Sequence, residues 1–201
     1  VICTHAHEDH VDGLAEIAEI VTFGNVYSNI TEFSPSQSFT KLRECLEKDG
    51  KKIIVPQIGD SITVGNCKVI FLGPGNMASW RTGNDRSLTC MLECCHKKFL
   101  MTADIGDRVI REWLESGVDV RADVLKVPHH GLEDLREEFL EAVKPEMAVI
   151  SYGKNSYGPL SRQLLKKLDK RNIAVLRTDS TGDIVCSVYN DHLEISPVDY
   201  K

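Results

Sequence analysis

The chain has 201 residues and a net charge of −6 at pH 7, with 42% hydrophobic and 27% charged residues. This length suits one domain, and the aliphatic content excludes a disordered chain. No apolar run reaches the roughly 18 residues that a membrane span needs, and the acidic balance excludes a protein that grips nucleic acid over its whole surface. The seven cysteines include no C-x-x-C pair, so we interpret them as buried reduced thiols of a cytoplasmic protein.

The first half of the chain predicts a mixture of strands and helices. In order, we expect a strand over 1–4, a short helix around 14–18 and a strand over 21–28. Ser34 as the N-cap and Pro35 in the first turn predict a helix that runs to about Lys48. Apolar β-rich runs follow, separated by turns, and predict strands over 53–55, 62–64, 67–72, 87–94 and 98–102.

The second half alternates more regularly between the two kinds of element. Helices are expected over about 107–116, 134–143 and 160–170. Strands are expected over 123–127, 147–151, 173–177, 183–189 and 192–195. This alternation is typical of an α/β sandwich rather than a helical bundle or an all-β protein. Because no repeat or linker interrupts it, we expect one domain over residues 1–201.

The segment Thr4–His10 reads T-H-A-H-E-D-H and contains the pattern H-x-H-x-D-H. Two imidazoles two residues apart on a loop could bind one metal ion, and the following Asp9 and His10 could bind a second. Neutral imidazole and carboxylate suit Zn, Mn or Fe. The alternative interpretation is a solvated His-rich turn after a strand, which the later motifs disfavour.

Two further strands are expected to end in polar side chains. The apolar run F-L-M-T-A-D ends in Asp104, and Asp107 is the better cap for the helix that follows. Asp104 is therefore available to bridge two metal ions. The run V-L-K-V-P-H-H-G leads into His129 and His130. Functional residues often lie in such loops, because the sheet behind them is rigid.

The order of these motifs resembles the metallo-β-lactamase superfamily of binuclear metal hydrolases, and more narrowly the ComEC-like competence-protein hydrolase domain. The narrower resemblance also rests on N-D-R-S-L at 84–88, G-K-N-S-Y-G at 153–158 and R-T-D at 177–179, so it covers nearly the whole chain. It implies an αββα sandwich with the metal site where strand ends meet. The strands that normally precede the His loop are absent, so we expect an N-terminally truncated domain.

The resemblance implies a role for each motif residue. It assigns the first metal to His5 and His7, the second to Asp9 and His10, and both to a bridging Asp104. One of His129 and His130 would complete the second site. We favour His129, because it comes directly off the strand.

Two segments depart from the wider pattern. Many superfamily members supply a further His to the first metal, but residues 84–87 contain none, as in ComEC-like members. Asp85, Ser87 or water would substitute for it. The step Tyr157–Gly158 leads into proline, where ComEC-like members usually continue with histidine, so a substrate or metal contact is missing there.

The implied cofactors are two divalent metal ions, Zn or Mn, with Fe as an alternative. They would lower the pKa of a bridging water and supply hydroxide near neutral pH. Asp9 and Asp104 would act in catalysis, Asp9 by orienting that hydroxide. Ser87, Lys154 and Asn155 could contact a substrate phosphate, although Lys154 and Asn155 also fit an ordinary polar turn.

The sequence thus predicts a metal-dependent hydrolase, namely a phosphodiesterase or nuclease that acts on DNA. The first alternative is the same chemistry on a small ester, lactone or amide. The second is a non-catalytic metal-binding scaffold, which the missing His of the first site favours. DNA as the substrate is the only partner that the resemblance suggests, and the oligomeric state has no signal in the sequence.

Overall fold

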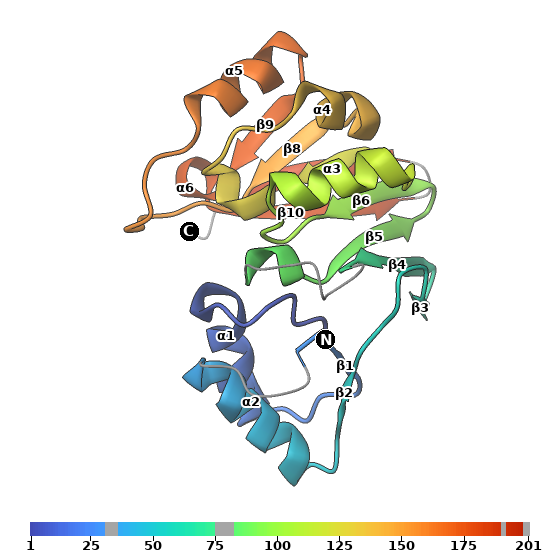
Figure 1. Ribbon diagram of the computed structural model, residues 1–201, viewed down its shortest axis with the longest axis vertical. Coiled ribbons are helices and arrows are strands. Elements are labelled where there is room, and N and C mark those ends of the chain that lie inside the picture. Colours follow the sequence, from blue (N-terminus) through green and yellow to red (C-terminus); the bar gives the residue numbers. More distant parts are fainter. Residues whose placement is uncertain (31–35, 75–82, 190–191, 199–201) are drawn as a thin grey trace. The chain divides into compact units, whose positions relative to one another are not determined.

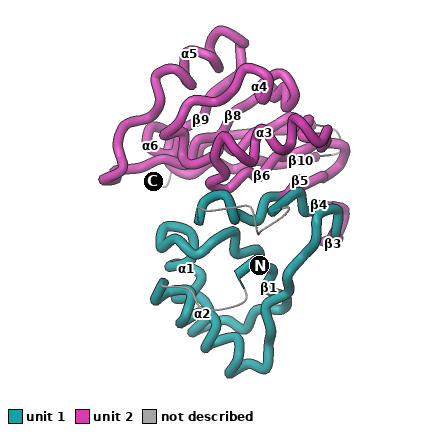
Figure 2. Tube along the Cα trace, viewed as in Figure 1, with its two compact units in different colours: residues 1–60, 71–89 teal, residues 61–70, 90–201 magenta. Residues whose placement is uncertain are grey.

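The computed structural model describes residues 1–30, 36–74, 83–189 and 192–198. The chain divides into two compact units (Figure 2). The first unit comprises residues 1–60 and 71–89, and the second comprises residues 61–70 and 90–201.

The first unit is built on two packed helices, α1 (Glu8–Ala18) and α2 (Gln37–Lys48). Apolar residues three or four positions apart give each helix one buried face, and these are Val11 and Ala15 in α1 and Phe39, Leu42 and Leu46 in α2. Beside the helices, the short strands β1 (Val26–Tyr27) and β2 (Ile53–Ile54) pair in parallel. The N-terminal run forms a single bridge to β1, between Ile2 and Tyr27.

Two expectations in this unit need correction. The strand expected over 21–28 is only two residues long, because α1 ends in hydrogen-bonded turns that carry the chain through Val21. The second helix is capped by Ser36, whose hydroxyl accepts a hydrogen bond from the backbone N–H of Phe39. Ser34 and Pro35, where we expected the helix to start, lie outside the described residues.

A seven-stranded sheet with the order β3-β4-β5-β6-β7-β8-β9 dominates the second unit (Figure 1). Its strands are β3 (Ser61–Val64), β4 (Cys67–Gly73), β5 (Thr89–Cys94), β6 (Lys97–Met101), β7 (Val124–Lys126), β8 (Met147–Ile150) and β9 (Ala174–Arg177). The pairs β3/β4 and β5/β6 are antiparallel, whereas β6 to β9 run parallel to one another. The carboxyl ends of β6 to β9 therefore meet at one edge of the sheet.

Each parallel step is made through a helix. The helices are α3 (Asp107–Ser116), α4 (Glu137–Val143) and α5 (Arg162–Lys170). Because such crossovers are right-handed and the strands follow in consecutive order, the three helices share one face of the sheet. In Figure 1, α3 and α4 lie in front of it. Phe139 and Leu164 are fully buried in this layer, as are Leu100 and Leu125 in the sheet.

The remaining elements are short or lie at the end of the chain. They are the 3₁₀ turns η2 (Asn84–Arg86) and η3 (Pro128–Gly131), the helix α6 (Thr178–Thr181), and the hairpin of β10 (Asp183–Tyr189) and β11 (His192–Val198). The expected α/β class is confirmed, and in the second half every expected helix and strand is present. Among the described residues, no helix combines the length and the apolar character that crossing a bilayer requires.

The cysteines do not all carry free thiols, which corrects the expectation from the sequence. Cys67 opens β4 and Cys94 closes β5, and the two are joined in a disulfide. Sequence spacing could not show this pair, because it forms only when β4 and β5 become neighbours. Cys3 and Cys90 fit the original interpretation, since burial raises the pKa of both thiols to about 11.

Candidate metal centre

Three imidazoles gather at the start of α1 in the first unit. His5 is almost fully buried, and its Nε2 lies 3.2 Å from Nδ1 of His7. The ring centroid of His10, in the first turn of α1, lies 4.2 Å from that of His5. Asp9 is exposed in the same turn, with its carboxylate 3.7 Å from Nε2 of His10. The H-x-H-x-D-H motif thus places its four donors around the entry to one helix.

Two hydroxyls hold the buried ring of His5. Its Nδ1 lies 3.2 Å from Oγ1 of Thr4 and 3.4 Å from Oγ of Ser87. The backbone N–H of Leu88 donates to the carbonyl of Thr4, which fixes the two segments in register. Ser87 is fully buried and contacts His5, and the substrate contact that we expected of it stays a prediction.

The segment before Ser87 is shaped to fit His7. A Cβ on Gly83 would lie 3.0 Å from Nε2 of His7, so a larger residue there would force that ring to shift. Asp85, which we considered as a substitute ligand, is buried in η2. Residues 84–87 therefore offer a carboxylate and a hydroxyl, but no imidazole.

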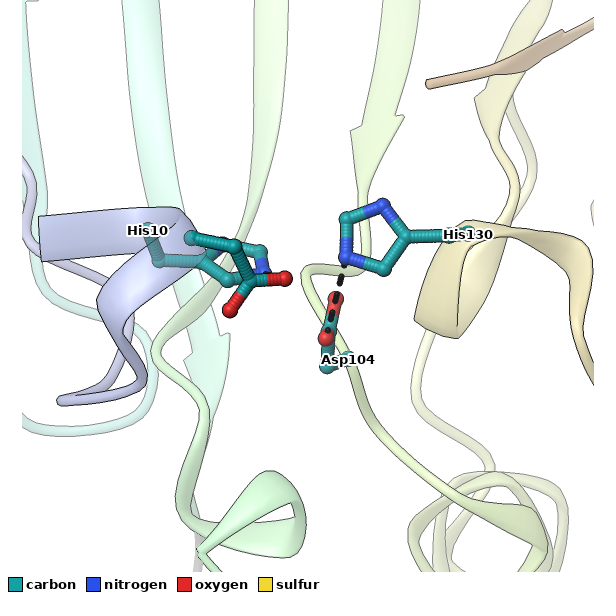
Figure 3. A group of neighbouring side chains, drawn as sticks. His10, Asp104 and His130 are labelled. Atoms are coloured by element: carbon teal, nitrogen blue, oxygen red, sulfur yellow. Dashed lines mark ion pairs between the residues drawn. The ribbon is translucent and has the colours of Figure 1, made fainter. Parts of the chain in front are cut away.

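In the second unit, Asp104 and His130 face each other from the ends of β6 and β7 (Figure 3). Nε2 of His130 lies 3.3 Å from Oδ2 of Asp104, whose side chain is 3% exposed. Nδ1 of His130 lies 2.8 Å from the carbonyl oxygen of Ser151. A carbonyl only accepts hydrogen bonds, so Nδ1 carries the proton and Nε2 is the nitrogen with a lone pair for a metal.

His130, and not the favoured His129, is therefore the residue beside Asp104. The backbone is left-handed at both histidines, with φ of 45° at His129 and 55° at His130. This turn directs His129 away from the strand end, and its Nδ1 lies 3.3 Å from the carboxylate of Glu133. Proximity to the strand was a poor guide, because it ignores the direction in which each ring leaves the turn.

Lys126 is a candidate site residue that the sequence motifs did not identify. Its ammonium donates to the carbonyl of Ala103 at 3.2 Å and lies 3.8 Å from Oδ1 of Asp104. The signal was its place on the strand that leads to the histidines. The hydrogen bond to Asp104 and the charge of that carboxylate raise the pKa of His130, while burial opposes them.

Asn155 and Lys154, the two expected phosphate contacts in the loop after β8, differ in whether their polar groups are available to a substrate. The amide of Asn155 donates to the carbonyl of Gly153 and accepts from the backbone N–H groups of Tyr157 and Gly158. Asn155 therefore shapes the loop, which is the alternative that we had left open. Lys154 is exposed on the same loop and keeps its ammonium available.

Both donor sets suit a divalent metal. Neutral imidazole and carboxylate are the ligands that Zn, Mn and Fe share. In each unit a ring nitrogen is oriented by an oxygen on its far side, Thr4 and Ser87 for His5 and Ser151 for His130. Such outer hydrogen bonds are typical of histidines that bind metals.

Comparison with solved structures identifies proteins of similar fold. The fold is similar to that of a possible metal-dependent hydrolase from Veillonella parvula, with a TM-score of 0.51, 13% identity, and 88% of this chain and 72% of that chain covered. It is also similar to CmlA, a diiron β-hydroxylase from Streptomyces venezuelae, with a TM-score of 0.52, 14% identity, and 87% and 42% covered. At such identities the likeness shows the fold alone.

A sequence relative is more specific. The chain is 30% identical over 188 residues to ComE operon protein 3 of Bacillus subtilis (strain 168), and the match covers 92% of this chain. The chain spans only 24% of the length of that protein. No family model matches the chain. The relative confirms the resemblance to ComEC-like proteins, and the solved structures confirm the α/β fold that this resemblance implies.

Proposed function

We propose that this chain is one binuclear metal-dependent hydrolase domain that cleaves phosphodiester bonds in DNA. The proposed ligands are His5, His7, Asp9, His10, Asp104 and His130. The observation that carries the proposal is the buried carboxylate of Asp104, which faces Nε2 of His130 at the ends of two adjacent parallel strands. A nearly buried carboxylate is costly unless cations neutralise it, so this edge of the sheet is suited to a cation.

The chain's own residues would orient the centre. The carbonyl of Ser151 holds His130 in the tautomer that leaves Nε2 available. Thr4 and Ser87 would position the ring of His5 from the side of Nδ1. When bound, the ions supply hydroxide near neutral pH and take up negative charge on the substrate. Asp9, exposed in the first turn of α1, would orient the attacking group.

Two features favour a phosphodiester substrate. The resemblance to ComEC-like domains covers nearly the whole chain and points to DNA. In addition, Lys154 lies exposed on the loop whose first residue, Ser151, contacts His130. Zn and Mn both fit the donor set, because imidazole and carboxylate bind either ion.

The test is the degradation of end-labelled single-stranded and double-stranded DNA with Mn²⁺ and then with Zn²⁺. Asp104→Asn keeps the shape of the side chain but removes its charge, and we expect it to abolish metal-dependent cleavage. His130→Gln should act in the same way, whereas the matched change His129→Gln should retain most activity. Absence of cleavage by a folded, two-metal wild-type chain would overturn the nuclease proposal.

One observation keeps a non-catalytic scaffold as a second candidate. Residues 84–87 bring a buried Asp85 and Ser87, but no imidazole, to the first unit's His cluster, so the first metal has fewer strong ligands. A scaffold would bind about one ion per chain and hydrolyse neither phosphodiesters nor lactones. Hydrolysis of a chromogenic lactone alone would instead indicate a hydrolase of small esters, lactones or amides.

A further inference from the structure

The loop between β8 and α5, residues 151–161, is attached at both ends to the turn that carries His130. At its start, the carbonyl of Ser151 contacts Nδ1 of His130 at 2.8 Å. At its end, the backbone N–H of Ser161 donates to the carbonyl of Gly131 at 2.9 Å. Any group displayed on this loop is therefore held at a fixed place beside the candidate metal ligand.

The loop is also held internally, and it carries an exposed aromatic side chain. The hydroxyl of Tyr152 donates to the carbonyl of Gly158, and Asn155 bonds three backbone groups of the loop. Tyr157, between these anchors, is 76% exposed. A large aromatic ring on a stiff loop costs little conformational entropy when it binds, and it offers a face on which a flat group can stack.

A basic cavity follows the loop. It has a volume of about 480 Å³, and Leu132, Pro159, Arg162 and Lys166 are among the residues that line it. Leu132 follows His130 by two residues, so the Cα atoms of the two lie at most about 7 Å apart. One wall of the cavity is therefore close to the turn that carries His130.

The two basic residues that line this cavity differ from other basic residues nearby in whether they form ion pairs. Lys167 pairs with Asp134 at 2.6 Å, and Arg171 pairs with two glutamates of α4. Within the part of the chain that the structure describes, Arg162 and Lys166 form no ion pair. The whole stretch 151–168 contains no acidic residue, although the chain carries a net charge of −6. This stretch is therefore basic on an acidic protein.

We propose that residues 154–166 form the contact surface for a single-stranded nucleic acid. Tyr157 stacks on a base, and Arg162 and Lys166 bind phosphates of the same strand. The combination of an exposed aromatic ring with unpaired cations is how proteins bind single strands without sequence preference. The inference rests on the proposed function, because it names a single strand as the substrate that the proposed metal centre cuts.

Binding is measured first, without turnover, as the fluorescence anisotropy of a labelled dT12 oligonucleotide in EDTA. We expect Arg162→Gln/Lys166→Gln to weaken binding at least ten-fold at low salt. The slope of log affinity against log salt should fall by about 1.4, since each phosphate contact on a single strand contributes about 0.7. The matched control is Lys170→Gln on the same helix but outside the cavity, and it should change the affinity less than two-fold.

The aromatic contact is tested separately. Tyr157→Ala should weaken dT12 binding about ten-fold, and Tyr157→Phe should restore it, because stacking needs the ring and not the hydroxyl. Tyr189, which is 63% exposed on β10, provides the control, and Tyr189→Ala should leave the affinity unchanged.

The outcomes separate this inference from the proposed function. Metal-dependent hydrolysis of bis(p-nitrophenyl) phosphate without dT12 binding would overturn the inference and leave the phosphodiesterase intact. An unchanged salt slope in Arg162→Gln/Lys166→Gln would also overturn it. Equal binding of polyglutamate, with the same losses in the variants, would show that the surface is for acidic polypeptides instead. Selective loss of dT12 binding in both sets of variants would establish the surface.

Discussion

Gly131 connects the packing of the second unit to the position of His130, and Gly131→Ala tests that connection. The backbone at Gly131 has φ of +74°, and an added Cβ would lie 3.2 Å from methyl carbons of both Ile150 and Leu160. A left-handed alanine costs about 1 kcal/mol, and forcing a methyl group into a packed core costs about 1–3 kcal/mol. We therefore expect the free energy of unfolding to fall by about 3 kcal/mol.

A second glycine separates the two contributions. Gly117, the C-terminal cap of α3, has φ of +70°, but a Cβ there would meet no atom within 4 Å. Gly117→Ala should therefore cost only the conformational part, about 1 kcal/mol. Urea unfolding followed by circular dichroism measures both variants. Equal losses at Gly117 and Gly131 would refute the packing argument, because they would mean that the two methyl contacts cost nothing.

Gly131→Ala should also affect the candidate metal site. Relief of the clash moves the turn that carries His130 away from Ile150, which disturbs the contacts of His130 to Ser151 and Asp104. We expect Gly131→Ala to weaken metal binding, measured by calorimetry with Mn²⁺, while Gly117→Ala leaves it unchanged. Normal metal affinity in a destabilised Gly131→Ala would show that the turn adjusts independently of the core.

Two further predictions concern charge. Lys126→Met leaves Asp104 with one cation fewer, so the melting temperature in EDTA should fall by several degrees, the equivalent of about 2 kcal/mol. Mn²⁺ should reduce this loss. An equal loss with and without Mn²⁺ would contradict the proposed role of Asp104. Arg136, by its hydrogen bond, holds the pKa of Asp107 below its ordinary 3.8. Asp107→Asn should therefore reduce stability above about pH 4, and the difference from wild type should vanish as the pH falls through that lowered pKa, as urea titrations from pH 2 to 7 would show.

The fold could be predicted well where the local signal is strong. The second half alternates amphipathic helices with short apolar strands, and the parallel sheet follows from that alternation. The first unit was harder to predict. The apolar run 21–28 resembles a strand, yet β1 has only two residues, Val26 and Tyr27. Its pairing with β2 depends on contacts with residues far along the chain, which a local pattern does not contain.

The candidate site, like the fold, could be predicted from the sequence only in part. The motifs identify the donor types around His5 and at Asp104, because metal chemistry restricts which residues can serve. They do not say which of two adjacent histidines turns toward Asp104, because that depends on backbone angles at His129 and His130. Nor do they show that the ammonium of Lys126 reaches Asp104 across the strand ends. Both facts depend on the register in which β6 pairs with β7.

The register of β6 against β7 also determines the backbone conformation of the site. Ala103, His129 and His130 all have left-handed φ angles, of 48°, 45° and 55°, each of which costs about 1–3 kcal/mol for a residue with a side chain. The carbonyl of Ala103 accepts the backbone N–H of His129 at 3.1 Å and the ammonium of Lys126 at 3.2 Å. The hydroxyl of Thr102 donates to the carbonyl of Lys126. These contacts tie the two strand ends together in a conformation that neither would adopt alone, so the pairing of β6 with β7 brings Asp104 and His130 face to face.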